Sequence, residues 1–237
     1  DKVIIKLLPI HIAGVFANMA ASGTAFETLQ VFGKVFALAI SMHLGYLILM
    51  YTVAGTVSGK NPFKALKNMI PAYTTAIGTM SSAATIPVTL ESVKSNKVTE
   101  KIADFVVPLG ATIHMAGSTI TLVTCAIAVV IIQGGTPQFG EFFHFILMLG
   151  VTIIASPGVP GGSVMAALGL LTSILGFGEA ASGLMIGLYL AQDSFGTACN
   201  VTGDGAISML VDAVANKFSS PQEESNTSIS TEAEANG

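Results

Sequence analysis

The chain has 237 residues, of which 51% are hydrophobic and only 10% are charged, whereas about a quarter of the residues of a soluble domain are charged. This composition indicates a membrane protein. The net charge of −4 at pH 7 comes without any basic cluster that carries interleaved aromatic residues, which excludes a nucleic-acid partner. Because the sequence has no hydrolase triad, phosphate-binding loop or Cys/His metal cluster, it does not indicate an enzyme.

The positive charges predict how the chain is oriented in the membrane. All of them are lysines, and most fall into two groups: Lys60, Lys64 and Lys67, and then Lys94, Lys97 and Lys101. Cytoplasmic loops carry the excess of positive charge, so we expect both groups on the cytoplasmic side of a plasma (inner) membrane, together with the C-terminal tail. The chain opens without a signal-peptide pattern, and we expect it to be the C-terminal part of a longer multi-pass protein.

The predicted membrane segments follow from this orientation in chain order. Residues 3–23 should cross the membrane outward, and residues 29–58 should cross back. Residues 1–60 are therefore expected to form two transmembrane helices. Residues 65–92 begin and end inside, and about 28 residues at 1.5 Å each are too few for two crossings. We therefore expect a re-entrant helical hairpin with "GTMSSAATIP" (residues 78–87) at its tip.

The remaining segments complete a first repeat over residues 65–133 and form a second repeat, with the opposite entry, over residues 141–217. Residues 100–133 should cross outward with an interruption at "PLGATIHMAGS", residues 141–175 should form a second re-entrant hairpin around "ASPGVPGGS", and residues 181–217 should return. Pro and Gly interrupt helices, and non-helical backbone at membrane depth is tolerated where protein or water covers it. The acidic, polar segment 218–237 is expected to be a disordered tail.

Two hairpins that enter the membrane from opposite faces, each followed by an interrupted helix, form an inverted repeat. This organisation is typical of secondary transporters, whose site lies at the midplane where the broken helices meet. The predicted fold is therefore an all-α membrane protein, an inverted-repeat secondary transporter with two re-entrant hairpins and two interrupted transmembrane helices. Its transport core is expected over residues 61–217.

Two aspartates in the last crossing segment are the strongest functional signal. Asp193, Thr197, Asn200 and Asp204 recur at helical spacing and share one stripe. A carboxylate inside a membrane costs several kcal/mol, and no lysine in this part of the chain can pair with either acid. The remaining partners are a bound cation, a substrate ammonium or a proton. About 16 Å of helix between the two acids predicts two sub-sites, one for an amine and one for a cation.

The sequence leaves open the roles of several other polar groups, most of which lie near the predicted interruptions. His114 lies in the broken part of its helix, where a structural and a functional role are both possible, while His11, His43 and His144 are assigned no role. The hydroxyls and helix-terminal amides of "MSSAATIP" suit a substrate carboxylate. Cys125 and Cys199 are expected to be small buried hydrophobic residues.

Four segments in order, "SSAATIPVT", "PLGATIHMAGS", "GVPGGS" and "QDSFGTACNVTGD", resemble the dicarboxylate/amino acid:cation symporter family, the glutamate transporter homologues. The resemblance runs from about residue 3 to residue 217 and is closest to the serine/threonine symporter branch. It implies that the chain corresponds to the family's fifth and sixth helices, first hairpin, interrupted seventh helix, second hairpin and eighth helix, without the first four helices.

The resemblance also implies roles for substrate-binding residues. Asp193 matches the aspartate that holds the substrate α-ammonium, and Asn200 matches the asparagine that meets the α-carboxylate. The remaining matches are the hairpin tips and two hydroxyls near the substrate side chain: Ser81 and Ser82 in the first tip, Val159 in the gating second tip, and Ser118 and Thr197.

The cation sites are implied in the same way. Asp204 matches a cation-site carboxylate, with carbonyl groups of Gly110 and Asn200 completing the site. A second, carbonyl-lined site corresponds to Thr112, Ile153, Ile154 and Ser156. His114 and Ala116 stand where the family has the Asn and Asp of "NMDGT", so a third sodium site is expected to be missing, and His114 becomes a candidate cation or proton ligand.

The chain lacks the arginine that acidic-substrate members use, and has Gly196 and Met80 at the two family positions. We therefore expect a sodium-coupled symporter of small neutral amino acids such as serine or threonine, with elevator-type alternating access and no cofactor beyond Na⁺, or H⁺, as coupling ion. Its partners would be the amino acid, the cation, the lipid bilayer and, in the full-length protein, two further copies in a homotrimer. The alternatives are a proton-coupled carrier of a dicarboxylate or acidic amino acid, with His114 as proton site, and a channel-like or structural membrane protein.

Overall fold

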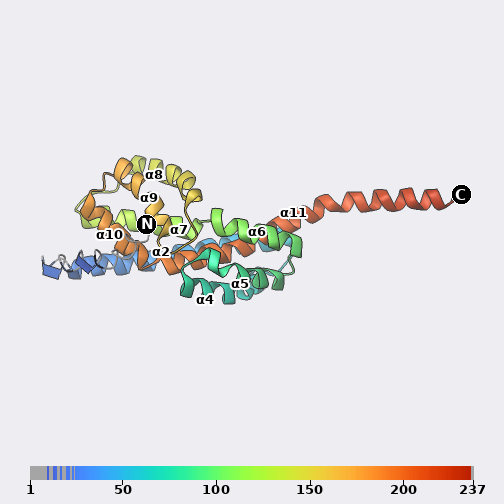
Figure 1. The fold of residues 1–237 in the computed structure, drawn as a ribbon, viewed down its shortest axis with the longest axis horizontal. Helices are drawn as coiled ribbons and strands as arrows, with labels where there is room; N and C mark the ends of the chain where they lie inside the picture. Colours follow the sequence, from blue (N-terminus) through green and yellow to red (C-terminus); the bar gives the residue numbers. More distant parts are fainter. Residues whose placement is uncertain are drawn as a thin grey trace.

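The computed structural model describes isolated residues between 10 and 23 and the continuous stretch 25–235, with side chains over residues 30–218. This part of the chain is helical and contains no strand (Figure 1), which confirms the predicted all-α class. The crossing helix predicted over residues 3–23 falls almost entirely outside the described residues.

The helices follow one another with short connections. In chain order they are α2 (Ala25–Ser58), α3 (Pro62–Asn68), α4 (Ile70–Thr79), α5 (Ser82–Ser95), α6 (Glu100–Ile113), α7 (Ala116–Ile132), α8 (Phe139–Thr152), the 3₁₀ turn η1 (Ile153–Ala155), α9 (Gly162–Leu175), α10 (Glu179–Leu190) and α11 (Asp193–Ala235). Two segments are long and apolar enough to cross a membrane by length and composition, Gln30–Ser58 and Glu100–Ile132.

Three breaks in these helices are the features that position the site. Helix α4 ends at Met80 in the left-handed conformation, with φ of 49°, and α5 begins at Ser81, whose hydroxyl accepts a hydrogen bond from Ala84 N at 3.2 Å. Helices α6 and α7 are separated by His114, which has an extended backbone, and Met115. Helices α8 and α9 are joined through η1 and the Pro- and Gly-rich segment 156–161.

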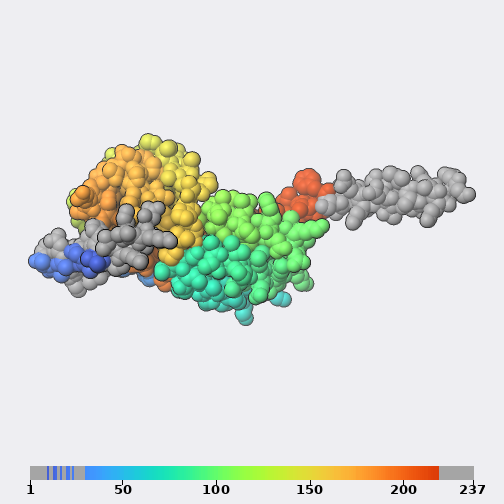
Figure 2. All heavy atoms as spheres, in the orientation of Figure 1, coloured from blue at the N-terminus to red at the C-terminus, as the bar shows by residue number. Residues whose placement is uncertain are grey.

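The body consists of two lobes with separate apolar cores (Figure 2), one of which includes α7 and the other α11. Helices α7 to α10 bury one cluster around Phe145, Leu171 and Tyr189. Helices α2 to α6 and α11 bury the other around Tyr51 and Met69. The division does not follow the two repeats predicted from the sequence, because α7 of the first repeat packs with the second hairpin and α11 of the second repeat packs with the first hairpin.

Helices α7 and α11 approach each other at glycines. A Cβ atom on Gly117 would clash with the carbonyl oxygen of Gly196 and with Cys199 Cβ. The backbones are therefore in direct contact, which is how small residues allow membrane helices to pack closely.

The two lysine groups meet at one end of the molecule. Lys60 Nζ donates to the carbonyl oxygen of Lys97 at 2.9 Å and lies 3.8 Å from the Asp212 carboxylate. Lys94 pairs with Glu100 at 2.7 Å. A single face for both groups is what the expected cytoplasmic location requires.

Helix α11 continues to Ala235 and extends away from the body (Figure 1). The disordered tail expected for residues 218–237 stays a prediction.

The α7–α11 contact gives a stability prediction. Gly117→Ala should lower the free energy of unfolding of the detergent-purified protein by about 1–3 kcal/mol, because the added methyl group overpacks the contact. Gly169→Ala in α9 is the matched control, since a Cβ there meets no atom within 4 Å and should be neutral or slightly stabilising. Equal melting temperatures for both variants would contradict the close contact.

Candidate substrate and cation site

A small cavity lies where the two hairpin tips meet the broken α6–α7 segment and the start of α11. Its lining residues are Met80, Ser82, Met115, Ser118, Pro157, Gly158, Val159, Ser163, Asp193, Thr197 and Asn200. The structure thus brings together six of the seven residues predicted to bind substrate. The seventh, Ser81, lies at the same tip as Ser82.

The tips of the two hairpins contact each other directly. Ser81 Oγ donates a hydrogen bond to the carbonyl oxygen of Gly158 at 2.6 Å. Gly158 also lies so close to the end of α6 that a Cβ atom on it would be 2.9 Å from the carbonyl oxygen of Ala111. These contacts hold the two tips together at one side of the cavity.

Asp193 lies at the first turn of α11 and is 4% exposed. Its Oδ2 accepts a hydrogen bond from the backbone N–H of Gly161 at 2.7 Å. Gly161 has a φ of 72°, a conformation that glycine adopts readily and that aims its N–H at the carboxylate. Asp193 therefore holds the second tip while lining the cavity.

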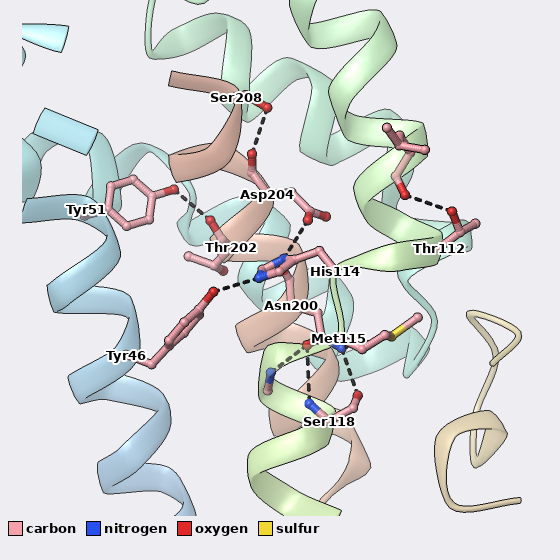
Figure 3. A network of polar contacts seen from close by, with 12 residues as sticks. Tyr46, Tyr51, Thr112, His114, Met115, Ser118, Asn200, Thr202, Asp204 and Ser208 are labelled. Atoms are coloured by element: carbon pink, nitrogen blue, oxygen red, sulfur yellow. Dashed lines mark hydrogen bonds and ion pairs between the residues drawn. The ribbon is translucent and has the colours of Figure 1, made fainter. Parts of the chain in front are cut away.

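Asn200 organises the beginning of α7 (Figure 3). Its Oδ1 accepts from the backbone N–H groups of Gly117 at 2.7 Å and Ser118 at 3.3 Å, and its Nδ2 donates to Ser118 Oγ at 2.8 Å. These contacts satisfy two N–H groups that the helix cannot satisfy itself. The amide thus joins α11 to the interrupted helix at the edge of the cavity.

Asp204, which is 1% exposed, has a protein partner that the sequence analysis did not identify. His114 Nδ1 lies 2.8 Å from Asp204 Oδ1, and His114 Nε2 lies 2.8 Å from the hydroxyl of Tyr46 (Figure 3). The inference that only a cation, an ammonium or a proton remained for this acid was wrong, because it considered lysines alone as partners. Gly110 allows the approach, since a Cβ atom there would be 2.5 Å from Asp204 Oδ1.

The residues predicted for the second cation site come from two segments in contact, the end of α6 and η1. Ile153 and Ser156 are buried, whereas Ile154 is half exposed and the Thr112 hydroxyl donates within its own helix to the carbonyl of Leu109. Over the residues that the structure describes, no group of three or more His, Cys, Asp or Glu side chains is placed to hold a metal ion. A cation at this position would have to be bound through backbone oxygens.

Met80 and Gly196, the two positions that the sequence analysis compared with arginine positions of the family, differ in their surroundings. Met80 lines the cavity. Gly196 faces α7, where a Cβ atom would be 3.1 Å from Thr121 Oγ1 and 3.4 Å from Gly117. The structure therefore has room for a long side chain at position 80 and little room at position 196.

Helix α2 contributes contacts that the sequence analysis missed. His43 Nε2 lies 3.0 Å from the carbonyl oxygen of Gly117, and Tyr51 donates its hydroxyl hydrogen to the carbonyl of Thr202 at 2.8 Å. With Tyr46, these side chains hold the broken α7 and the middle of α11. Their only signal in the sequence is that they are polar groups on an otherwise apolar helix.

Comparison with known proteins agrees with this architecture. Residues 2–214 match the model of the sodium:dicarboxylate symporter family, so the chain belongs to that family and is part of a membrane transporter. Its relatives include excitatory amino acid transporter 1 of Ambystoma tigrinum, which is 28% identical over 81% of this chain and 35% of its own length. Excitatory amino acid transporter 2 of Mus musculus is 31% identical over 67% of this chain and 27% of its own length. An excitatory amino acid transporter of Caenorhabditis elegans is 32% identical over 61% of this chain and 29% of its own length. The chain spans about a third of the length of these curated relatives.

The contact between the tips gives a prediction about access to the cavity. In a Val159→Cys background, Ser81→Ala should raise the rate of maleimide labelling at position 159 by about two- to tenfold, because one lost hydrogen bond costs about 0.5–1.5 kcal/mol. Both native cysteines are buried, which keeps background labelling low. Ser95→Ala, on the exposed side of the same helix, is the control. If the Ser81 and Ser95 variants label at the same rate, the tip contact does not restrain the second hairpin.

Proposed function

We propose that the intact protein is a cation-coupled symporter of small neutral amino acids such as serine or threonine, with sodium as the coupling ion. The observation that carries the proposal is the buried Asp193 carboxylate, which lines one cavity with both hairpin tips, Thr197 and Asn200. A buried carboxylate in an apolar body needs a cationic partner, and the α-ammonium of an amino acid supplies one. Family membership supports the coupling to sodium.

The same cavity accounts for the rest of the amino acid. The hydroxyl of Ser82 and the N–H groups at the start of α5 suit the α-carboxylate, since helix N-termini favour anions. Thr197 and Ser118 would meet a small polar side chain. No arginine occurs anywhere in the sequence, so a second carboxylate would be buried unpaired at a cost of several kcal/mol.

Movement of the loaded hairpins and α11 past the remaining helices would give alternating access of the elevator type. The family resemblance supports a homotrimer in a plasma (inner) membrane, with the lysine-rich end and the tail of α11 on the cytoplasmic side. A cation bound through the backbone oxygens of Thr112, Ile153, Ile154 and Ser156 would couple sodium to the closing of the second tip.

A second candidate is a proton-coupled carrier of a dicarboxylate or acidic amino acid. The observation that favours it is the hydrogen bond between His114 and Asp204, which puts two titratable groups in the interior. Uptake into proteoliposomes under a sodium gradient, and separately under a proton gradient, distinguishes the two candidates. The sodium-coupled proposal fails if only the proton gradient drives uptake.

Replacement of Asp193 tests the amine sub-site. Asp193→Asn should weaken serine binding by more than about tenfold, because the loss of a charge-assisted contact costs about 1.5–3 kcal/mol. The amide oxygen can still accept the hydrogen bond from Gly161, which preserves the tip. Asp104→Asn is the matched control, since Asp104 is 53% exposed and lies at the lysine-rich end. Unchanged serine affinity in a competition assay on the Asp193 variant would remove this residue from the amine site.

The side chain at position 80 should set the charge of the substrate. In the parent, serine should bind more than about a hundredfold better than aspartate, and Met80→Arg should shift the ratio towards aspartate by at least about tenfold, because it supplies a bidentate donor at the cavity. Met80→Gln has similar length without charge and should leave the preference for serine in place. Aspartate that displaced labelled serine from the parent at equal concentration would refute the neutral-substrate proposal.

A further inference from the structure

Three oxygen atoms near the break between α6 and α7 contact one residue, His114: one contacts its backbone N–H and two contact its imidazole. The carbonyl oxygen of Gly110 accepts from the backbone N–H of His114 at 2.9 Å. The carbonyl oxygen of Asn200 and Oδ1 of Asp204 lie 3.1 Å and 2.8 Å from His114 Nδ1. Two carbonyls and a buried carboxylate are hard oxygen ligands of the kind that bind a small cation.

We propose that the imidazole of His114 takes the place of a coupling cation at Asp204. The protein then carries one fewer sodium ion per substrate molecule than it would if a sodium ion were bound at Asp204. The inference rests on the proposed function, because it concerns the number of ions coupled to the amino acid. It assigns sodium coupling to the carbonyl-lined positions of α6 and η1.

The hydrogen-bond partners determine how the ring is oriented. A carbonyl oxygen and an ionised carboxylate can only accept hydrogen bonds, so Nδ1 must carry the hydrogen that Asn200 and Asp204 share. Nε2 is then free to accept the hydroxyl hydrogen of Tyr46, at 2.8 Å. A sodium ion needs the same two oxygens and cannot bind them while the Nδ1 hydrogen lies between them.

The imidazole ring also packs between two other helices, α2 and α11 (Figure 3). Gly203 of α11 leaves space for it, since a Cβ atom there would clash with Cε1 of the imidazole. Tyr46 of α2 lies alongside with a ring-centroid separation of 6.1 Å and an interplanar angle of 30°. The packing contacts and the hydrogen bonds of both ring nitrogens hold the ring in the same position. Displacing the ring therefore requires breaking several contacts at once.

The ratio of sodium to substrate tests the inference directly. The intact protein and its His114→Asn variant are reconstituted in liposomes, and serine accumulation is measured at equilibrium under imposed sodium gradients with the membrane potential clamped at zero. The asparagine is shorter and can present an oxygen, so the variant should gain one sodium ion per serine. A tenfold sodium gradient should then give about tenfold greater accumulation than in the parent.

His144→Asn on the exposed face of α8 is the matched control and should keep the ratio of the parent. An unchanged ratio in His114→Asn overturns the inference and leaves the proposed function standing. If neither the parent nor any variant shows sodium-driven uptake, the proposed function fails, and the inference with it.

A second measurement covers the case in which His114→Asn does not fold. Sodium titration of serine binding, with serine held at the same multiple of each protein's own dissociation constant, should have the same midpoint in Asp204→Asn as in the parent, because no sodium ion contacts Asp204 in either. A clear shift of the sodium midpoint in this variant would overturn the inference.

Discussion

The need to give partners to two carboxylates in an apolar interior determines most of this structure. Asp193 and Asp204 are almost fully buried on α11, in a body whose two cores are built from aliphatic and aromatic side chains. A buried charge without a partner costs far more than the net gain of an ordinary hydrogen bond. The surrounding chain supplies a backbone N–H from a hairpin tip to the first acid and an imidazole to the second.

Those partners exist because neighbouring helices are broken at the same level. An intact helix uses its own N–H and C=O groups, so only a break frees them for contacts with another segment. The irregular segment after η1 supplies the N–H of Gly161 to Asp193 and the carbonyl of Gly158 to Ser81. Asn200 then satisfies the N–H groups that the break leaves at the start of α7. The interruptions and the polar stripe of α11 therefore depend on each other.

The sequence predicted the local features and missed the long-range ones. Gly, Pro and hydroxyl residues indicated the stretches in which the helices are interrupted, but Pro87 and Pro108 lie inside α5 and α6 and not at the breaks themselves. The helical spacing on α11 identified Asp193, Thr197 and Asn200, which line the cavity together. The pairing of His114 with Asp204 joins residues 90 positions apart, and the contact between the tips joins residues 77 positions apart. Local periodicity carries no information about which of several polar groups meet at such a distance, and Tyr46 and His43 of α2 escaped notice for the same reason.

The glycine contact between α7 and α11 has a mechanical consequence. With no side chains between the two backbones at Gly117 and Gly196, the helices cannot slide or rotate against each other without a collision of main-chain atoms. Asn200 and Asp204 extend this junction along α11 through their contacts with Ser118 and His114. Helices α7 and α11 thus form one rigid unit, and any displacement that moves the cavity must carry both helices together. The degrees of freedom that remain lie in the hairpin tips and in the outer surfaces of the body.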